Sequence, residues 1–189
     1  MFIDVNMDVF DAVKARRSVR AYDSKQVPRD ILDKILEAGR LAPSAGSIQP
    51  WHFIVVTEAA KREHLARGGR FARFLVESPV VIVGCGDKKA SPNWYVVDVA
   101  IAMQNMVLTA TDEGLGTCWI GSFKERQVKE MLGIPENLTV VSLLALGYPK
   151  SDRRDLLGKM IKLIRKKKSL KEIVSFEEYG KSPSELAKE

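Results

Sequence analysis

Apolar side chains recur at helical spacing along much of this chain, with polar residues between them, and this pattern predicts five helices. The predicted helices cover residues 8–16, 28–40, 58–67, 94–113 and 125–132. Pro28 suits the start of the second helix, because the first turn leaves unused the N–H that proline lacks. Gly114 follows the fourth and longest predicted helix, where a glycine commonly ends a helix.

Four short stretches are rich in apolar and β-branched residues. Three of them predict strands, and the third in chain order predicts a short strand or an extended turn. These stretches are WHFIVVT, PVVIVGC, GTCWIG and LTVVSLLALGYP, which begin at residues 51, 79, 116 and 138. The second is apolar throughout, as is typical of a strand covered on both faces. Residues 170–179 predict a short helix or an irregular arm. The pattern as a whole predicts an α+β fold, a small sheet flanked by helices.

The composition is that of one globular enzyme domain, with 46% hydrophobic and 29% charged residues. We expect a single domain over residues 1–189, with a C-terminal arm from about residue 150. The first ten residues carry two aspartates and lack the apolar segment of a signal peptide. The apolar run 95–110 is interrupted by Asp98, which favours a buried helix over a membrane span. These features predict a cytoplasmic protein without a membrane partner.

The net charge of +6 is unevenly distributed. Residues 150–171 contain ten Lys or Arg and two Asp, so the rest of the chain is slightly acidic. An anion-binding site is therefore expected in this basic segment or in the cluster between Arg16 and Arg20. Neither Cys85 nor Cys118 belongs to a metal-binding spacing, and no metal site is predicted.

Two motifs stand out as candidates for ligand binding. The first, ARRSVRAYD, spans residues 15–23 and gathers three arginines and a serine within five positions. The second, APSAGSIQPW, spans residues 42–51, with small residues between two prolines that would let the backbone approach a planar ligand. Gln49 offers donors and an acceptor in one plane, which suits the edge of a heterocycle. Alternatively, the arginines face solvent and the second motif is a turn before a strand.

These motifs and two further blocks resemble the nitroreductase family of FMN-dependent oxidoreductases. The four blocks, in chain order, are ARRSVRAYD, LAPSAGSIQPWHFIVV, DVAIAMQNMVLTATDEGLGTCWIGSF and LGYP…RKKKSLKEIVSFEEYG. The resemblance spans nearly the whole chain. It implies a nitroreductase-like fold and a homodimer with two FMN sites at the subunit interface, to which the long helix 94–113 contributes.

The resemblance also implies which residues bind the cofactor. Arg16, Arg17 and Ser18 would hold the FMN phosphate and ribityl chain, with Arg20 near the polar edge of the flavin. Arg165 and Lys167 match the late phosphate-binding positions of the family, although Lys166 or Lys168 could replace Lys167 in the run RKKKS.

Two further groups complete the implied site. The loop of the partner subunit would cover the flavin ring with Pro43, Ser44, Ser47 and Gln49. Gly121 and Ser122 would place backbone N–H groups near flavin N5. The family often has Asn where this chain has Ser47, so this contact with the flavin differs from the family pattern.

The resemblance implies an enzyme that takes hydride from NAD(P)H and passes the electrons to a nitroaromatic, a quinone or a similar small-molecule acceptor by a ping-pong mechanism. No catalytic side chain is predicted, because the flavin N5 carries the chemistry. Dehalogenation or enoyl-type reduction on the same fold is an alternative. A second alternative is a protein whose basic tail binds nucleic acid or a membrane surface, although neither partner is expected.

Overall fold

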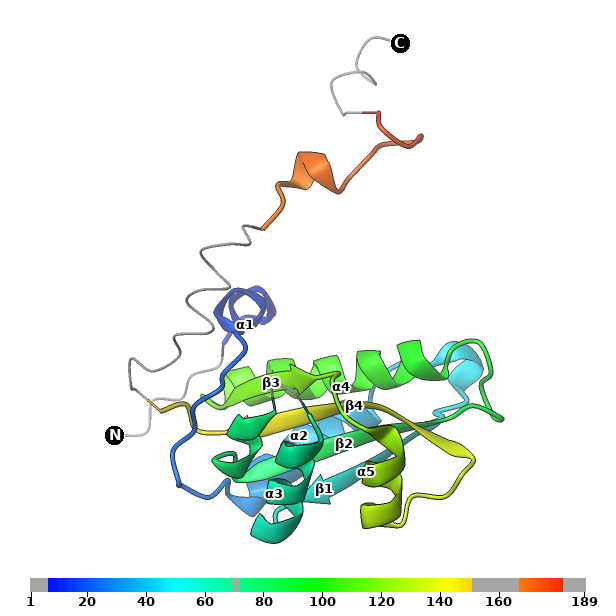
Figure 1. Ribbon diagram of the computed structural model, residues 1–189. Helices are drawn as coiled ribbons and strands as arrows, with labels where there is room; N and C mark the ends of the chain where they lie inside the picture. Colours follow the sequence, from blue (N-terminus) through cyan, green and yellow to red (C-terminus); the bar gives the residue numbers. More distant parts are fainter. Residues whose placement is uncertain (1–6, 70–71, 151–166, 182–189) are drawn as a thin grey trace. The chain divides into compact units, whose positions relative to one another are not determined.

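The computed structural model describes residues 7–69, 72–150 and 167–181 (Figure 1). The chain divides into two compact units, Met1–Asp155 and Leu156–Glu189, and each is considered by itself below. Every described strand and every described α-helix belongs to the first unit. The described part of the second unit contains a short 3₁₀ turn, η3 (Leu170–Glu172), and is otherwise irregular.

The described strands form one antiparallel sheet in the order β1-β2-β4-β3. The strands are β1 (Trp51–Val56), β2 (Val80–Asp87), β3 (Gly116–Ile120) and β4 (Leu138–Gly147). The three strands predicted from the sequence are confirmed, and the stretch GTCWIG, predicted as a short strand or an extended turn, forms the strand β3. β3 lies at one edge of the sheet, which leaves its outer side open to pairing with another segment of the chain.

The α-helices of the described residues also follow the predictions closely. They are α1 (Val9–Ala15), α2 (Arg29–Arg40), α3 (Ala59–Gly68), α4 (Tyr95–Asp112) and α5 (Glu125–Leu132). Pro28 precedes α2, and its carbonyl accepts the Leu32 N–H at 3.0 Å. Gly114 follows α4 with φ of 71°, the left-handed conformation that glycine adopts readily. Two short turns, η1 (Ala45–Ser47) and η2 (Arg73–Val76), complete the unit.

Helices cover both faces of the sheet (Figure 1). On one face Val81 and Val83 of β2 pack in a cluster with side chains of α3 and α5. On the other face Val80 and Ile82 pack in a cluster with side chains of α2 and α4. Successive residues of a strand point to opposite faces, so an uninterrupted apolar β2 serves both clusters. The prediction that this strand is buried on both faces is confirmed.

The first half of α4 lies unusually close to β2. A Cβ at Gly84 would collide with the sulfur of Met103, and a Cβ at Gly86 would lie 2.8 Å from Cδ2 of Tyr95. Two glycines therefore make room for the helix on the sheet. This close packing fixes the position of the first turn of α4, which contains the buried Asp98. In the part of the chain that the structure describes, no helix has both the length and the apolar character to span a membrane.

Candidate functional site

The arginine motif is attached to the edge strand of the sheet. The Val19 N–H donates to the Thr117 carbonyl at 2.8 Å, and Ser18 forms a parallel bridge with Thr117. The buried Val19 side chain lies against Gly116, where a Cβ would be 2.6 Å from it. The hydroxyl of the buried Tyr22 donates to the Val19 carbonyl at 2.7 Å. These contacts fix Ser18 and the arginines around it beside the start of β3.

Burial also acts on the tyrosine that anchors this motif. It raises the pKa of Tyr22 well above its ordinary value, and a nearby Cys118 acts in the same direction while Arg20 opposes it. The phenol therefore stays protonated and keeps donating its hydrogen bond at any pH that the fold tolerates. The anchor of the arginine motif is insensitive to pH over the physiological range.

The guanidinium groups of this motif have no acidic partner among the residues that the structure describes. Arg16, Arg17 and Arg20 form no side-chain hydrogen bond or ion pair with a described residue. By contrast, Arg29, Arg40, Arg67 and Arg126 each pair with a carboxylate of their own helix. Arg17 is exposed, whereas Arg16 and Arg20 are half-buried. Three uncompensated guanidinium groups with a hydroxyl between them match the chemistry of a bound phosphate.

The second motif folds into a tight, strained loop. The turn η1 is closed by hydrogen bonds from Ser47 N–H to the Ser44 carbonyl at 3.0 Å and from Gln49 N–H to Ser44 Oγ at 2.9 Å. Three of its residues have left-handed backbone, with φ of 56° at Gly46, 55° at Ser47 and 52° at Gln49. Such angles are uncommon outside glycine and tend to be kept at ligand sites.

This conformation leaves the polar groups of the loop available. The side chains of Ser47 and Gln49 are exposed and make no hydrogen bond to a described residue. Pro43 is exposed as well, while Ser44 is half-buried and uses its oxygen to close the loop. The loop therefore presents a hydroxyl and an amide to the outside, as a site for a planar polar ligand requires.

A contact that the sequence reasoning missed holds the start of this loop. The Ala45 N–H donates to Oδ1 of Asp98 at 3.1 Å. In the sequence, Asp98 stands out only because it interrupts an apolar run and so disfavours a membrane span. A carboxylate inside an otherwise apolar helical run was the available signal, because a buried charge needs hydrogen-bond partners.

Gly121 and Ser122 continue from the end of β3. Both are exposed, and neither backbone N–H donates to another described residue. The Gly69 backbone packs against the Ser122 carbonyl so closely that a Cβ on Gly69 would collide with it. At about 3.3 Å per strand residue, Gly121 lies about 13 Å along the strand from Thr117 and the arginine motif. One edge strand thus carries a cationic group at one end and free amides at the other.

The two phosphate-binding candidates from the basic segment, Arg165 and Lys167, are not part of the first unit. Arg165 lies outside the described residues. Lys167 is described and exposed, and it belongs to the second compact unit. Within the first unit, the structure brings the arginine motif and the Gly121–Ser122 amides to the same edge strand.

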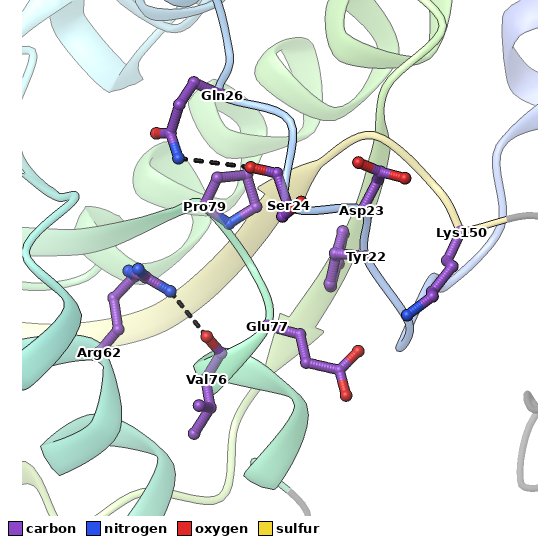
Figure 2. Close-up of a pocket in the computed structure, with 9 residues that line it drawn as sticks. All are labelled: Tyr22, Asp23, Ser24, Gln26, Arg62, Val76, Glu77, Pro79 and Lys150. Carbon is purple, nitrogen blue, oxygen red and sulfur yellow. Dashed lines mark hydrogen bonds between the residues drawn. The ribbon is translucent and has the colours of Figure 1, made fainter.

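A separate cavity of about 440 Å³ lies beside the start of β2 (Figure 2). Its lining comprises Tyr22, Asp23, Ser24, Gln26, Arg62, Val76, Glu77, Pro79 and Lys150. Arg62 already donates to the carbonyls of Val76 and Ser78, at 2.8 and 2.6 Å. Burial lowers the pKa of this guanidinium. The cavity also mixes acidic and basic side chains and contains none of the cofactor-binding residues expected from the sequence.

The sheet between two helical layers makes this an α+β protein, and the arginine motif beside β3 has no acidic partner among the described residues. Comparison with known proteins identifies the family. The Nitroreductase family profile matches residues 13–68 and 66–148. An Archaeoglobus fulgidus relative, named as an NADH dehydrogenase/NAD(P)H nitroreductase, is 38% identical over 148 residues, which cover 75% of this chain and 85% of the relative.

Solved structures show the same fold. A nitroreductase family protein from Clostridium novyi is 33% identical, with a TM-score of 0.74 over 95% of this chain and 98% of the other. An FMN-dependent nitroreductase from Clostridium difficile is 29% identical, with a TM-score of 0.74 over 89% of this chain and 98% of the other. This chain belongs to the nitroreductase family and is an oxidoreductase with the nitroreductase fold. Both the family resemblance and the α+β prediction are confirmed.

Proposed function

We propose that this protein is an FMN-dependent NAD(P)H oxidoreductase that reduces nitroaromatic, quinone or similar small acceptors. The observation that carries the proposal is the cluster Arg16, Arg17 and Arg20, which has no acidic partner among the described residues. A phosphate monoester carries about two negative charges at neutral pH and accepts bidentate hydrogen bonds from guanidinium groups. The FMN dependence of the Clostridium difficile relative points to the same cofactor.

The residues of this chain would bind and orient the cofactor. We assign the phosphate and ribityl chain to Arg16, Arg17 and Ser18, with Arg20 nearer the flavin, and the free amides of Gly121 and Ser122 to the flavin edge. The loop residues Pro43, Ser44, Ser47 and Gln49 would cover the ring. Arg165 and Lys167 stay candidates for the phosphate on the family resemblance alone.

None of these residues is a carboxylic acid or a histidine, the side chains that most often act as general acids and bases. The chain's part in the reaction is therefore binding and orientation, and no side chain is assigned to proton transfer. When bound, FMN supplies the chemistry of accepting a hydride and releasing its electrons to a second substrate. If the NAD(P)H donor and the acceptor occupy one pocket in turn, steady-state kinetics follow a ping-pong pattern. Intersecting lines in a double-reciprocal plot would contradict this scheme.

A homodimer is part of the proposal. Apolar side chains are exposed on α1 (Val9, 73%, and Phe10, 66%) and on α4 (Trp94, 54%, and Val96, 46%). Such a concentration of exposed apolar area on two elements is typical of an association surface. In the dimer the loop of one chain would serve the FMN of its partner. Sedimentation equilibrium at micromolar concentration tests this proposal, and a mass equal to one chain of 21.1 kDa would contradict it.

The first experiment is an absorption spectrum of the purified protein saturated with FMN under anaerobic conditions. We expect flavin absorbance that bleaches after addition of NADH or NADPH and recovers after addition of a nitroaromatic or quinone. The nucleotide that bleaches faster identifies the preferred donor. A flavin spectrum that neither nucleotide bleaches would favour dehalogenation or enoyl-type chemistry instead. Failure to retain or take up FMN would contradict the proposed function altogether.

A further inference from the structure

Asp98 carries a buried carboxylate, a group that the packing of an apolar core does not require. Its side chain is 2% exposed in the first turn of α4, next to the buried Val99 and near Ala102. It forms no ion pair with a basic residue in the described ranges. A buried carboxylate is costly unless it is hydrogen-bonded, although the positive end of a helix dipole helps to offset the charge. The few hydrogen bonds that Asp98 does make are therefore informative.

Those bonds connect α4 to the strained loop. Oδ1 of Asp98 accepts the Ala45 N–H at 3.1 Å, and Oδ2 faces the hydroxyl of Ser91 at 3.4 Å. Ala45 is the first residue of η1 and directly precedes Gly46, the first of the left-handed residues. The carboxylate thus holds the backbone at the point where the unusual conformation begins.

The C-terminal end of the loop, at Pro50, is held by the segment that connects β2 to α4. The Pro50 carbonyl accepts the Asp87 N–H at 2.8 Å, and the Asp87 carbonyl accepts the Ser91 N–H at 3.1 Å. Ser91 in turn contacts Asp98 through its side chain. The segment from Asp87 to Asp98 therefore fixes both ends of the loop, one through a backbone amide and the other through a carboxylate.

A loop of this kind needs such support. Left-handed backbone at Ser47 and Gln49 is disfavoured for residues with side chains, and it persists only where surrounding contacts impose it. Of the two attachments, the one at Pro50 continues the antiparallel pairing of β1 with β2 and would form wherever these two strands pair. The attachment at Ala45 depends on a single side chain, and that side chain is Asp98.

We propose that Asp98 is a positioning residue for the cofactor: its carboxylate anchors the Ala45 amide and so holds Ser47 and Gln49 in the conformation that binds FMN. This inference rests on the proposed function, because it assigns the loop to FMN. Asp98 itself is buried beneath the loop and has no direct contact with the ligand in this scheme. Its effect reaches the cofactor only through the backbone of the loop.

Two substitutions at Asp98 separate hydrogen bonding from volume and charge. Asp98→Asn keeps an oxygen for the Ala45 N–H and gains an N–H for Ser91 Oγ, so we expect FMN affinity within about threefold of the unchanged protein. Asp98→Leu keeps the branched shape of the side chain, with a somewhat larger volume, but has no acceptor, and we expect the Kd for FMN to rise about tenfold or more. Flavin fluorescence titration measures both values.

A second readout does not depend on FMN. Hydrogen–deuterium exchange of the cofactor-free protein should show the Ala45–Gln49 peptide exchanging about tenfold faster in Asp98→Leu and unchanged in Asp98→Asn, because only the leucine variant releases the Ala45 amide. Ala45→Pro removes the donor instead of the acceptor and leaves α4 unaltered. Ser44 has extended backbone, with ψ of 156°, which a following proline permits. We expect this variant to lose FMN affinity as Asp98→Leu does, even if the leucine variant fails to fold.

The matched control is Ser78→Ala. Ser78 is also buried and polar, and its hydroxyl donates to the Val80 and Leu146 carbonyls at 2.7 and 3.0 Å, at the opposite end of β2 from the loop. This variant should lose stability while its loop exchange and FMN affinity stay unchanged.

Three results would overturn the proposal. The first is wild-type exchange and affinity in Asp98→Leu, and the second is Asp98→Asn as impaired as Asp98→Leu. The third is a loss of affinity in Ser78→Ala equal to that in Asp98→Leu, since general destabilisation would then explain both. If the unchanged protein binds no FMN, the proposed function fails separately, and the exchange data still support or overturn the anchor between Asp98 and the loop.

Discussion

Replacing Arg16 and Arg17 together with alanine is expected to weaken FMN binding by about 100-fold or more. A hydrogen bond between charged groups contributes about 1.5–3 kcal/mol, and each tenfold change in affinity corresponds to about 1.4 kcal/mol. Loss of one such bond from each arginine therefore accounts for at least this factor. Neither guanidinium forms a hydrogen bond or ion pair with a described residue, so the fold should tolerate their removal. The measurement is a fluorescence titration with FMN at fixed ionic strength.

The control for the arginine variant removes the same charge elsewhere. Arg29 and Arg126 are exposed arginines, each in an ion pair with a carboxylate four residues later in its own helix. Exposed pairs of this kind contribute little to stability. The double variant R29A/R126A should therefore bind FMN as tightly as the unchanged protein. If both double variants lose affinity equally, the effect comes from net charge alone, and the assignment of Arg16 and Arg17 to the phosphate is wrong.

Leu144→Ala is expected to lower the free energy of unfolding by about 2–5 kcal/mol, the usual range for truncating a buried leucine. Leu144 is 0% exposed in β4, in the cluster that contains Met103 of α4 and Ile35 of α2. Its position between sheet and helices leaves little room for neighbours to fill the cavity. Urea denaturation followed by circular dichroism measures the change.

Val76→Ala is the companion variant for the core prediction. Val76 is 52% exposed, so its truncation removes little buried area, and we expect a change below about 0.5 kcal/mol. A loss for Leu144→Ala no larger than that for Val76→Ala would mean that the packing between β4 and α4 contributes far less than its burial indicates.

The periodicity of the sequence alone determined nearly all the elements of the first unit. The apolar stretches at β1, β2, β3 and β4 and the helical patterns at α1 to α5 depend on local composition, and the structure places them within one or two residues of their predicted bounds. The residues that mark helix ends also act through their own backbone preferences. Pro28 lies directly before α2, and Gly114 follows α4. The family could also be recognised, because its motifs are contiguous in the chain.

The tertiary structure decided what those motifs can do. The sequence shows three arginines close together. Only packing reveals that no described acidic residue pairs with them and that Val19 attaches them to the edge of β3. Strand order is likewise invisible in the chain, since β4 pairs between β2 and β3. The role inferred for Asp98 depends on Ala45, a residue 53 positions away. Local patterns fix local conformation, whereas the environment of a charge depends on contacts between distant segments, and these form only when the sheet and its helices assemble.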